Sequence, residues 1–94
     1  MKEHRDTINR LSIELDEDPE RFEVYADRFE NRLQARLVQK LDFSDLRCWA
    51  YDLDGVMIEL YWDDATEQGI SIRMMDEEND EMLREVGKTI INDA

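Results

Sequence analysis

The residue types that could do chemistry in this chain are mostly carboxylates. Its 94 residues include 25 Asp and Glu against 12 Lys and Arg, which gives a formal net charge of −13. The imbalance is greatest in residues 45–94, with fourteen acids and four bases. Such a field repels nucleic acids and anionic lipids and attracts cationic proteins. We therefore expect a basic protein partner, no direct nucleic-acid binding and no membrane contact.

The acids concentrate in three clusters, at Glu14–Asp18, Asp63–Glu67 and Asp76–Glu81. None has the ligand spacing of an EF-hand loop, so no metal site is predicted. The second and third clusters flank one expected strand and are predicted to form a single negative surface. Solubility and capping of a helix start are alternative roles for these acids. The candidate partner-binding residues are Asp63, Asp64, Glu67, Asp76, Glu77, Glu78, Asp80 and Glu81, with Tyr61 on the neighbouring sheet face.

The sequence offers few nucleophiles or metal ligands. Cys48 is the only cysteine, so an intramolecular disulfide is excluded and a reducing compartment is expected. It lies in an expected strand with no histidine or lysine close by in sequence, which is typical of a buried structural thiol. His4 has no second histidine to pair with. We predict no catalytic residue, no metal and no cofactor.

One segment, Ala50–Val56, reads A-Y-D-L-D-G-V. It resembles the first motif of the haloacid dehalogenase superfamily, in which an apolar strand ends in D-x-D-G-[TV]. The resemblance implies a nucleophilic Asp52, an acid/base Asp54 and bound magnesium. That chemistry also requires a basic residue and a further acidic pair at the ends of parallel strands. The alternative is that Asp54-Gly55 forms a tight hairpin turn, and this is the interpretation we adopt.

Two helices are expected before that motif. Ile8, Leu11 and Leu15 recur at spacings of three and four, which predicts a helix over residues 6–15. Asp18 and Pro19 are typical of a helix N-cap and first position. A second helix is predicted from Pro19 to about Leu41. Its apolar face comprises Phe22, Tyr25, Ala26, Phe29, Leu33 and Leu37.

After Leu46 the apolar period changes to two, which predicts strands over residues 46–53 and 56–63. Closing the Asp54-Gly55 turn pairs Leu53 with Val56, Tyr51 with Ile58, Trp49 with Leu60 and Arg47 with Trp62. A third strand, residues 70–75, should pair through Leu60 and Ile72. A final helix follows the third acidic cluster, with the apolar stripe Met82, Leu83, Val86 and Ile90.

These elements predict an α+β fold in one domain, residues 1–94. The expected order is two N-terminal helices, a three-stranded antiparallel meander and a C-terminal helix (ααβββα), with the helices on one face of the sheet. No apolar run approaches the ~18 residues of a membrane span and Met1–Asp6 lacks a secretory signal, so we expect a cytoplasmic protein. It could be a monomer or a homodimer.

In size and acidity the chain resembles the immunity proteins of colicins and of contact-dependent inhibition systems. This likeness is one of type, without a shared motif. The net charge of −13, its bias toward residues 45–94 and the lack of catalytic groups favour a small acidic inhibitor that neutralises a basic partner such as a nuclease toxin. Two alternatives fit the same charge. A nucleic-acid mimic would compete with DNA on several proteins, and an acidic secretion chaperone would be a dimer that wraps an unfolded basic segment.

Overall fold

The computed structural model describes residues 1–76 and 78–92. Six strands form one antiparallel sheet in the order β1-β2-β6-β5-β4-β3. The strands are β1 (Lys2–Arg5), β2 (Leu11–Asp16), β3 (Arg36–Asp42), β4 (Leu46–Leu53), β5 (Val56–Asp63) and β6 (Ile70–Met74). A 3-10 turn, η1 (Pro19–Arg21), precedes α1 (Phe22–Asn31), and α2 (Asp80–Ile91) follows the sheet. None of the helices described is long and apolar enough to cross a membrane.

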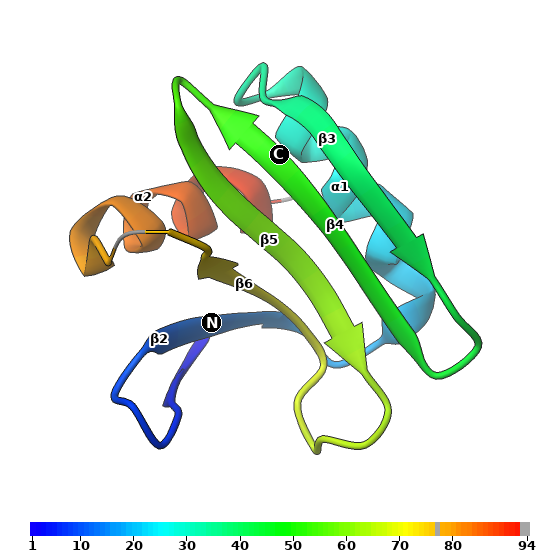
Figure 1. Cartoon of the computed structure of the whole chain (residues 1–94). Coiled ribbons are helices and arrows are strands. Elements are labelled where there is room, and N and C mark those ends of the chain that lie inside the picture. Colours follow the sequence, from blue (N-terminus) through cyan, green and yellow to red (C-terminus); the bar gives the residue numbers. More distant parts are fainter. Residues whose placement is uncertain (77, 93–94) are drawn as a thin grey trace.

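Both helices lie behind the sheet in the view of Figure 1 and cover the same face. Two aromatic contacts seat α1 on β4: Phe22 meets Trp49 edge-on, and Phe29 stacks on Tyr51 with 4.7 Å between ring centroids. The remaining core comes from the helix-facing positions of the strands and from α2. Its fully buried members include Ile13, Ile58, Leu60, Ile70, Ile72, Leu83 and Ile90.

The prediction of a helix over residues 6–15 is wrong, because this segment forms a turn and β2. Asp6 closes the turn by accepting hydrogen bonds from the backbone N–H groups of Ile8 and Arg10. Leu11, Ile13 and Leu15 then alternate toward the helices, and all three are buried. Residues four apart, such as Leu11 and Leu15, share one face in a helix and also in a strand, so their spacing fits both structures. Ile13, which interrupts the helical stripe, is the residue that fits only the strand.

The prediction that the second helix continues to Leu41 is also wrong. Asp18 caps η1 and Pro19 occupies its first turn, as expected. However, the helix ends after Asn31, where Gln34 takes a left-handed conformation with φ 55 and the N–H of Ala35 bonds to the carbonyl of Phe29. The C-cap itself is Arg32, which is right-handed and whose N–H bonds to the carbonyl of Arg28, so the left-handed turn follows two residues later and without a glycine. The chain then returns as β3, which pairs with β4.

The sheet therefore has six strands instead of three, and the ααβββα order is overturned. The rest of the sheet follows the expected register. β4 and β5 pair Leu53 with Val56, Tyr51 with Ile58, Trp49 with Leu60 and Arg47 with Trp62, and β6 joins through Leu60 and Ile72. The helix α2 buries Leu83, Val86 and Ile90, three of the four stripe residues.

Two substitutions distinguish the observed strand from the helix expected at the N-terminus. Ile13→Ala should lower the free energy of unfolding by about 2–4 kcal/mol, because it opens a cavity beneath α2. Ile8→Ala should change it by less than about 0.5 kcal/mol, because Ile8 is 70% exposed. Urea unfolding of the two variants measures both values. A larger loss for Ile8→Ala would contradict the strand assignment.

Candidate binding surface

One end of the sheet gathers acids from three separate segments. This end, toward the lower right of Figure 1, is formed by the β3–β4 connection, the β5–β6 loop and the end of β2. The N–H of Asp64 bonds to the carbonyl of Asp45 at 2.9 Å, which joins the first two segments. The third is joined through Gly69. We call this the loop-end acidic surface; it comprises Glu17, Asp45, Asp63, Asp64 and Glu67.

Gly69 sets how closely the β5–β6 loop approaches β2. A Cβ built on this glycine would lie 2.0 Å from the carbonyl oxygen of Asp16 and 2.7 Å from the Cα of Glu17, so the two backbones are in direct contact. The N–H of Gly69 also donates to the carboxylate of Glu14 at 3.2 Å, and Glu14 is only 7% exposed. The contact brings the first acidic cluster beside the second.

Few cations offset this surface. Within residues 1–76 and 78–92, no ion pair is formed by Asp45, Asp63, Asp64 or Glu67. Glu17 lies 3.5 Å from Lys2, but both side chains are largely exposed, and such pairs contribute about 0–1 kcal/mol. The carboxylate of Asp63 accepts a hydrogen bond from the N–H of Ala65, which fixes the loop. The charges on this surface therefore face solvent.

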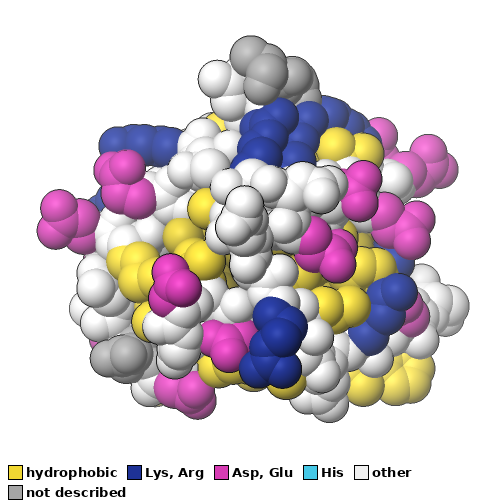
Figure 2. Space-filling model, turned by 90° about the horizontal axis from the view of Figure 1, so that it is seen from above, with side chains coloured by type: hydrophobic (Ala, Val, Ile, Leu, Met, Phe, Trp, Pro, Cys, Tyr) yellow, Lys and Arg dark blue, Asp and Glu magenta, His cyan; other side chains and the backbone are white. Residues whose placement is uncertain are grey.

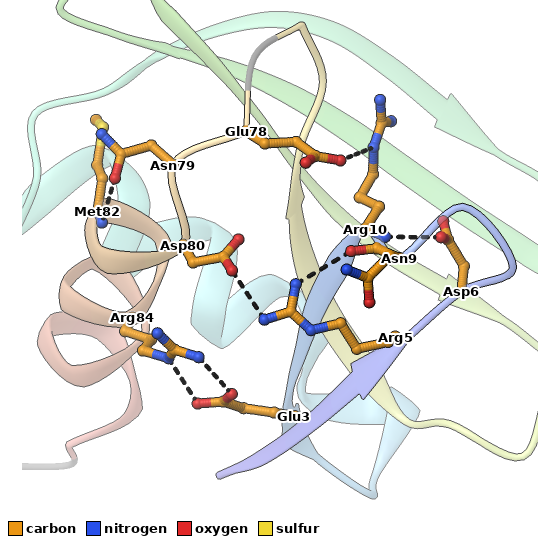
Figure 3. A network of polar contacts seen from close by, with 10 residues as sticks. All are labelled: Glu3, Arg5, Asp6, Asn9, Arg10, Glu78, Asn79, Asp80, Met82 and Arg84. Atoms are coloured by element: carbon orange, nitrogen blue, oxygen red, sulfur yellow. Dashed lines mark hydrogen bonds and ion pairs between the residues drawn. The ribbon is translucent and has the colours of Figure 1, made fainter.

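The third acidic cluster lies at the opposite end of β6, and two of its four described acids are paired with cations of the chain. Arg5 donates to Asp80 at 2.8 Å, and Arg10 lies 3.9 Å from Glu78 (Figure 3). Asn79 caps α2 by accepting from the N–H of Met82. Glu81 forms no ion pair with a described residue and, like Asp76, is exposed. The predicted Glu77 lies outside the described residues.

A neighbouring pair of charges completes the network of Figure 3. The Nε and Nη2 atoms of Arg84 each donate a hydrogen bond of 2.9 Å to the carboxylate of Glu3. The hydrogen bond from Arg84 lowers the pKa of Glu3, and the same pair raises the pKa of Arg84. This pair and the contact of Arg5 with Asp80 attach β1 to α2, and Arg10 links the turn after β1 to Glu78, which precedes α2. They also mix positive with negative charge in this region of the surface.

The structure thus separates acids that the sequence was expected to bring together. The second and third clusters lie at opposite ends of β6, and the first cluster joins the second instead. The end of the molecule away from the loop-end acidic surface is seen in Figure 2, where Lys and Arg side chains lie among Asp and Glu. Of the predicted partner-binding residues, only Asp63, Asp64 and Glu67 lie on the loop-end acidic surface.

Tyr61 lies on the sheet face that carries no helix and is only 8% exposed. The guanidinium of Arg73 sits 4.3 Å from the centre of its ring, and Arg73 also donates to Glu59 at 2.8 Å. These charged groups cover the tyrosine. Tyr61 lines a hollow on the open sheet face together with Arg73.

Cys48, on β4, borders the same hollow and pairs with Tyr61 of β5. Burial is the largest of the effects that raise the pKa of its thiol, and Glu59 adds to it. A raised pKa disfavours the reactive thiolate. His4, in β1, pairs with Ser12 of β2, and its Nε2 lies 3.5 Å from the Glu14 carboxylate. His4 is thus part of the sheet.

The aspartates of the dehalogenase-like segment serve the hairpin. Asp54 and Gly55 adopt positive φ values of 51 and 87, and the carboxylate of Asp52 accepts from the N–H of Gly55. That hydrogen bond and the contact with Arg36 lower the pKa of Asp52. The strand pairs antiparallel on both sides, unlike the parallel arrangement that the resemblance implies. Among the described residues no group of three or more His, Cys, Asp or Glu could hold a metal ion.

No protein-family model matches the chain, and searches of curated proteins and of solved structures found no match. The assignment of a function therefore depends on the fold and its surface.

Gly69→Ala tests the contact that assembles the loop-end acidic surface. The added methyl group would overlap backbone atoms of Asp16 and Glu17, which cannot move aside as a flexible side chain could. We expect the free energy of unfolding to fall by at least about 2 kcal/mol, measured by urea denaturation. Gln68→Ala, one position earlier in the loop, is the control and should cost less than about 1 kcal/mol. Equal effects of the two variants would show that the backbones are not in contact.

The carboxylate of Asp16 gives a pH-dependent prediction. Burial, the largest effect, acts to raise its pKa, but hydrogen bonds from the Asp18 N–H and the Tyr25 hydroxyl, together with Arg21, lower it overall. A lowered folded-state pKa gives stability that is complete above the unfolded value of about 3.9 and is lost as the pH falls through the folded value.

The difference in unfolding free energy between the natural chain and Asp16→Asn should therefore be constant, at about 1–2 kcal/mol, from pH 7 to about pH 4.5. It should shrink as the pH falls below about 4. Urea titrations at fixed ionic strength measure this difference. A difference that grows toward low pH would contradict the assigned direction.

Proposed function

We propose that this protein is a small acidic binding protein, acting in the cytoplasm, that neutralises a basic protein partner such as a nuclease toxin. The loop-end acidic surface is the proposed contact. The supporting observation is that two separate segments bring Asp45, Asp63, Asp64 and Glu67 to one end of the sheet, beside Glu17 of a third, with no cation paired to these four in the described part of the chain. Binding, and not catalysis, is the activity that such a surface favours.

The proposed mechanism is exclusion of the partner's substrate. Carboxylates that already face solvent attract a cationic active-site surface from a distance and raise the association rate. Once docked, they occupy the positions that the substrate's phosphates would take. The third cluster contributes less to this attraction, because Arg5 and Arg10 already offset Asp80 and Glu78.

The proposal is tested by removing three charges from each end of the molecule in turn. The partner is first captured from the native host at low salt and identified by mass spectrometry. Association rates are then measured for Asp45→Asn, Asp64→Asn and Glu67→Gln combined. We expect a decrease of about tenfold, and for the natural chain a steep decrease with rising salt.

The matched control combines Asp76→Asn, Glu78→Gln and Glu81→Gln, which removes the same number of charges from the opposite end. We expect it to slow association less than threefold, because long-range attraction falls with distance and is screened by salt. An equal effect of the two triple variants would place the contact elsewhere. Association that is insensitive to salt would contradict the proposed mechanism as a whole.

The captured material also distinguishes the two other functions considered for this sequence. A nucleic-acid mimic would retain several unrelated DNA-binding proteins and release them on addition of DNA. A secretion chaperone would retain one basic protein in an unfolded state. The inhibitor proposed here should retain one folded basic protein.

A further inference from the structure

The two edges of the sheet differ in how they are protected. β1 is four residues long and its sequence, KEHR, is entirely polar. Charged side chains on a short edge strand discourage pairing with other chains. The opposite edge, β3, is seven residues long and lies along the outside of the sheet in Figure 1. Among the described strands, only β4 pairs with it.

The β3 edge also exposes apolar groups. Val38, Leu41 and Phe43 are 48%, 41% and 60% exposed, and they account for half of the large exposed hydrophobic side chains of the described residues. The register of β3 shifts between Leu37 and Gln39, which leaves Val38 without a partner on β4. Such a bulge disrupts pairing locally. The regular, available part of the edge is therefore residues 39–43.

The backbone of this part is oriented for pairing. The N–H of Phe43 bonds to the carbonyl of Leu46 at 2.7 Å, so Phe43 and, by alternation, Leu41 and Gln39 direct their backbone groups toward β4. Lys40 and Asp42 consequently direct theirs away from the sheet. Their side chains lie on the helix-covered face, where Lys40 covers the ring of Trp49 and Asp42 accepts from its Nε1.

We propose that a second copy of this chain pairs antiparallel with the β3 edge, about a two-fold axis at Leu41. This register places Lys40 opposite Asp42 of the second copy, and each such pair can exchange two backbone hydrogen bonds. Leu41 faces Leu41 of the second copy, and Gln39 faces Phe43, on the open side of the sheet. Backbone orientation, charge and apolar character all agree in this register, as a self-complementary two-fold interface requires. A register shifted to place the axis at Lys40 would oppose two lysines.

Local charge favours a second copy at this edge despite the net charge of −13. Residues 32–47 carry the four bases Arg32, Arg36, Lys40 and Arg47 against the two acids Asp42 and Asp45. Two copies can therefore approach here with less repulsion than at the loop-end acidic surface. The inference does not depend on the proposed function.

The first test measures oligomeric state and amide exchange together. Sedimentation velocity should show a dimer for the natural chain and a monomer for Leu41→Lys, which would place two ammonium groups at the two-fold axis. Ile8→Lys, a change at an exposed site on the far edge, should leave the dimer intact. With increasing protein concentration, hydrogen exchange of the Lys40 and Asp42 amides should slow while that of Leu41 stays constant. A monomer at all concentrations, or a dimer unaffected by Leu41→Lys, would overturn the proposal.

The second test addresses the register. Lys40→Glu and Asp42→Lys should each weaken self-association at least tenfold, since each variant opposes like charges in two pairs. Mixing the two variants should restore association, because every introduced charge then faces its opposite. Far-UV circular dichroism and cooperative urea unfolding check that each variant is folded, because both substituted side chains contact the ring of Trp49. Folded variants whose mixture remains monomeric would exclude this register and with it the proposed interface.

Discussion

The arrangement of charge in this protein depends on the close contact between Gly69 and the end of β2. A residue with a Cβ at that position would overlap the carbonyl oxygen of Asp16, so only glycine lets the β5–β6 loop lie directly on this strand. The contact also buries the carboxylate of Glu14, which would be unfavourable without a partner. The N–H of Gly69 supplies a hydrogen-bond partner at 3.2 Å, and the imidazole Nε2 of His4 lies 3.5 Å away without hydrogen-bonding to it. Two acidic segments are thereby held together although their mutual repulsion would separate them.

The two ends of the sheet consequently have different electrostatic character. At the loop end, carboxylates from three segments face solvent. At the other end, β1 supplies Arg5, the turn after it supplies Arg10, and both approach acids that precede or begin α2. A net charge of −13 thus describes the composition but not the field that a partner meets. The β3 edge adds a third region, in which local charge is positive and apolar groups are exposed.

The sequence correctly predicted those elements whose hydrophobic pattern fits only one kind of secondary structure. Asp54-Gly55 and the alternation on both sides of it predicted the β4–β5 register residue by residue, and the helix stripe of α2 was confirmed. The N-terminal segment was assigned wrongly because Ile8, Leu11 and Leu15 fit a helix, whereas only Ile13 indicated the strand. The end of α1 had no sequence signal, since Gln34 adopts the left-handed conformation usually taken by glycine. Because β2 was not predicted, the contact between the first and second acidic clusters could not be foreseen.

We expect negative potential to be concentrated at the loop-end acidic surface and not at the start of α2. It can be measured without a partner by comparing the paramagnetic relaxation of backbone amide protons in the presence of a cationic and of an anionic nitroxide. We expect the preference for the cationic probe to be greatest at the amides of Asp45, Asp64 and Glu67. A greater preference at Glu78, Asp80 and Glu81 would contradict it.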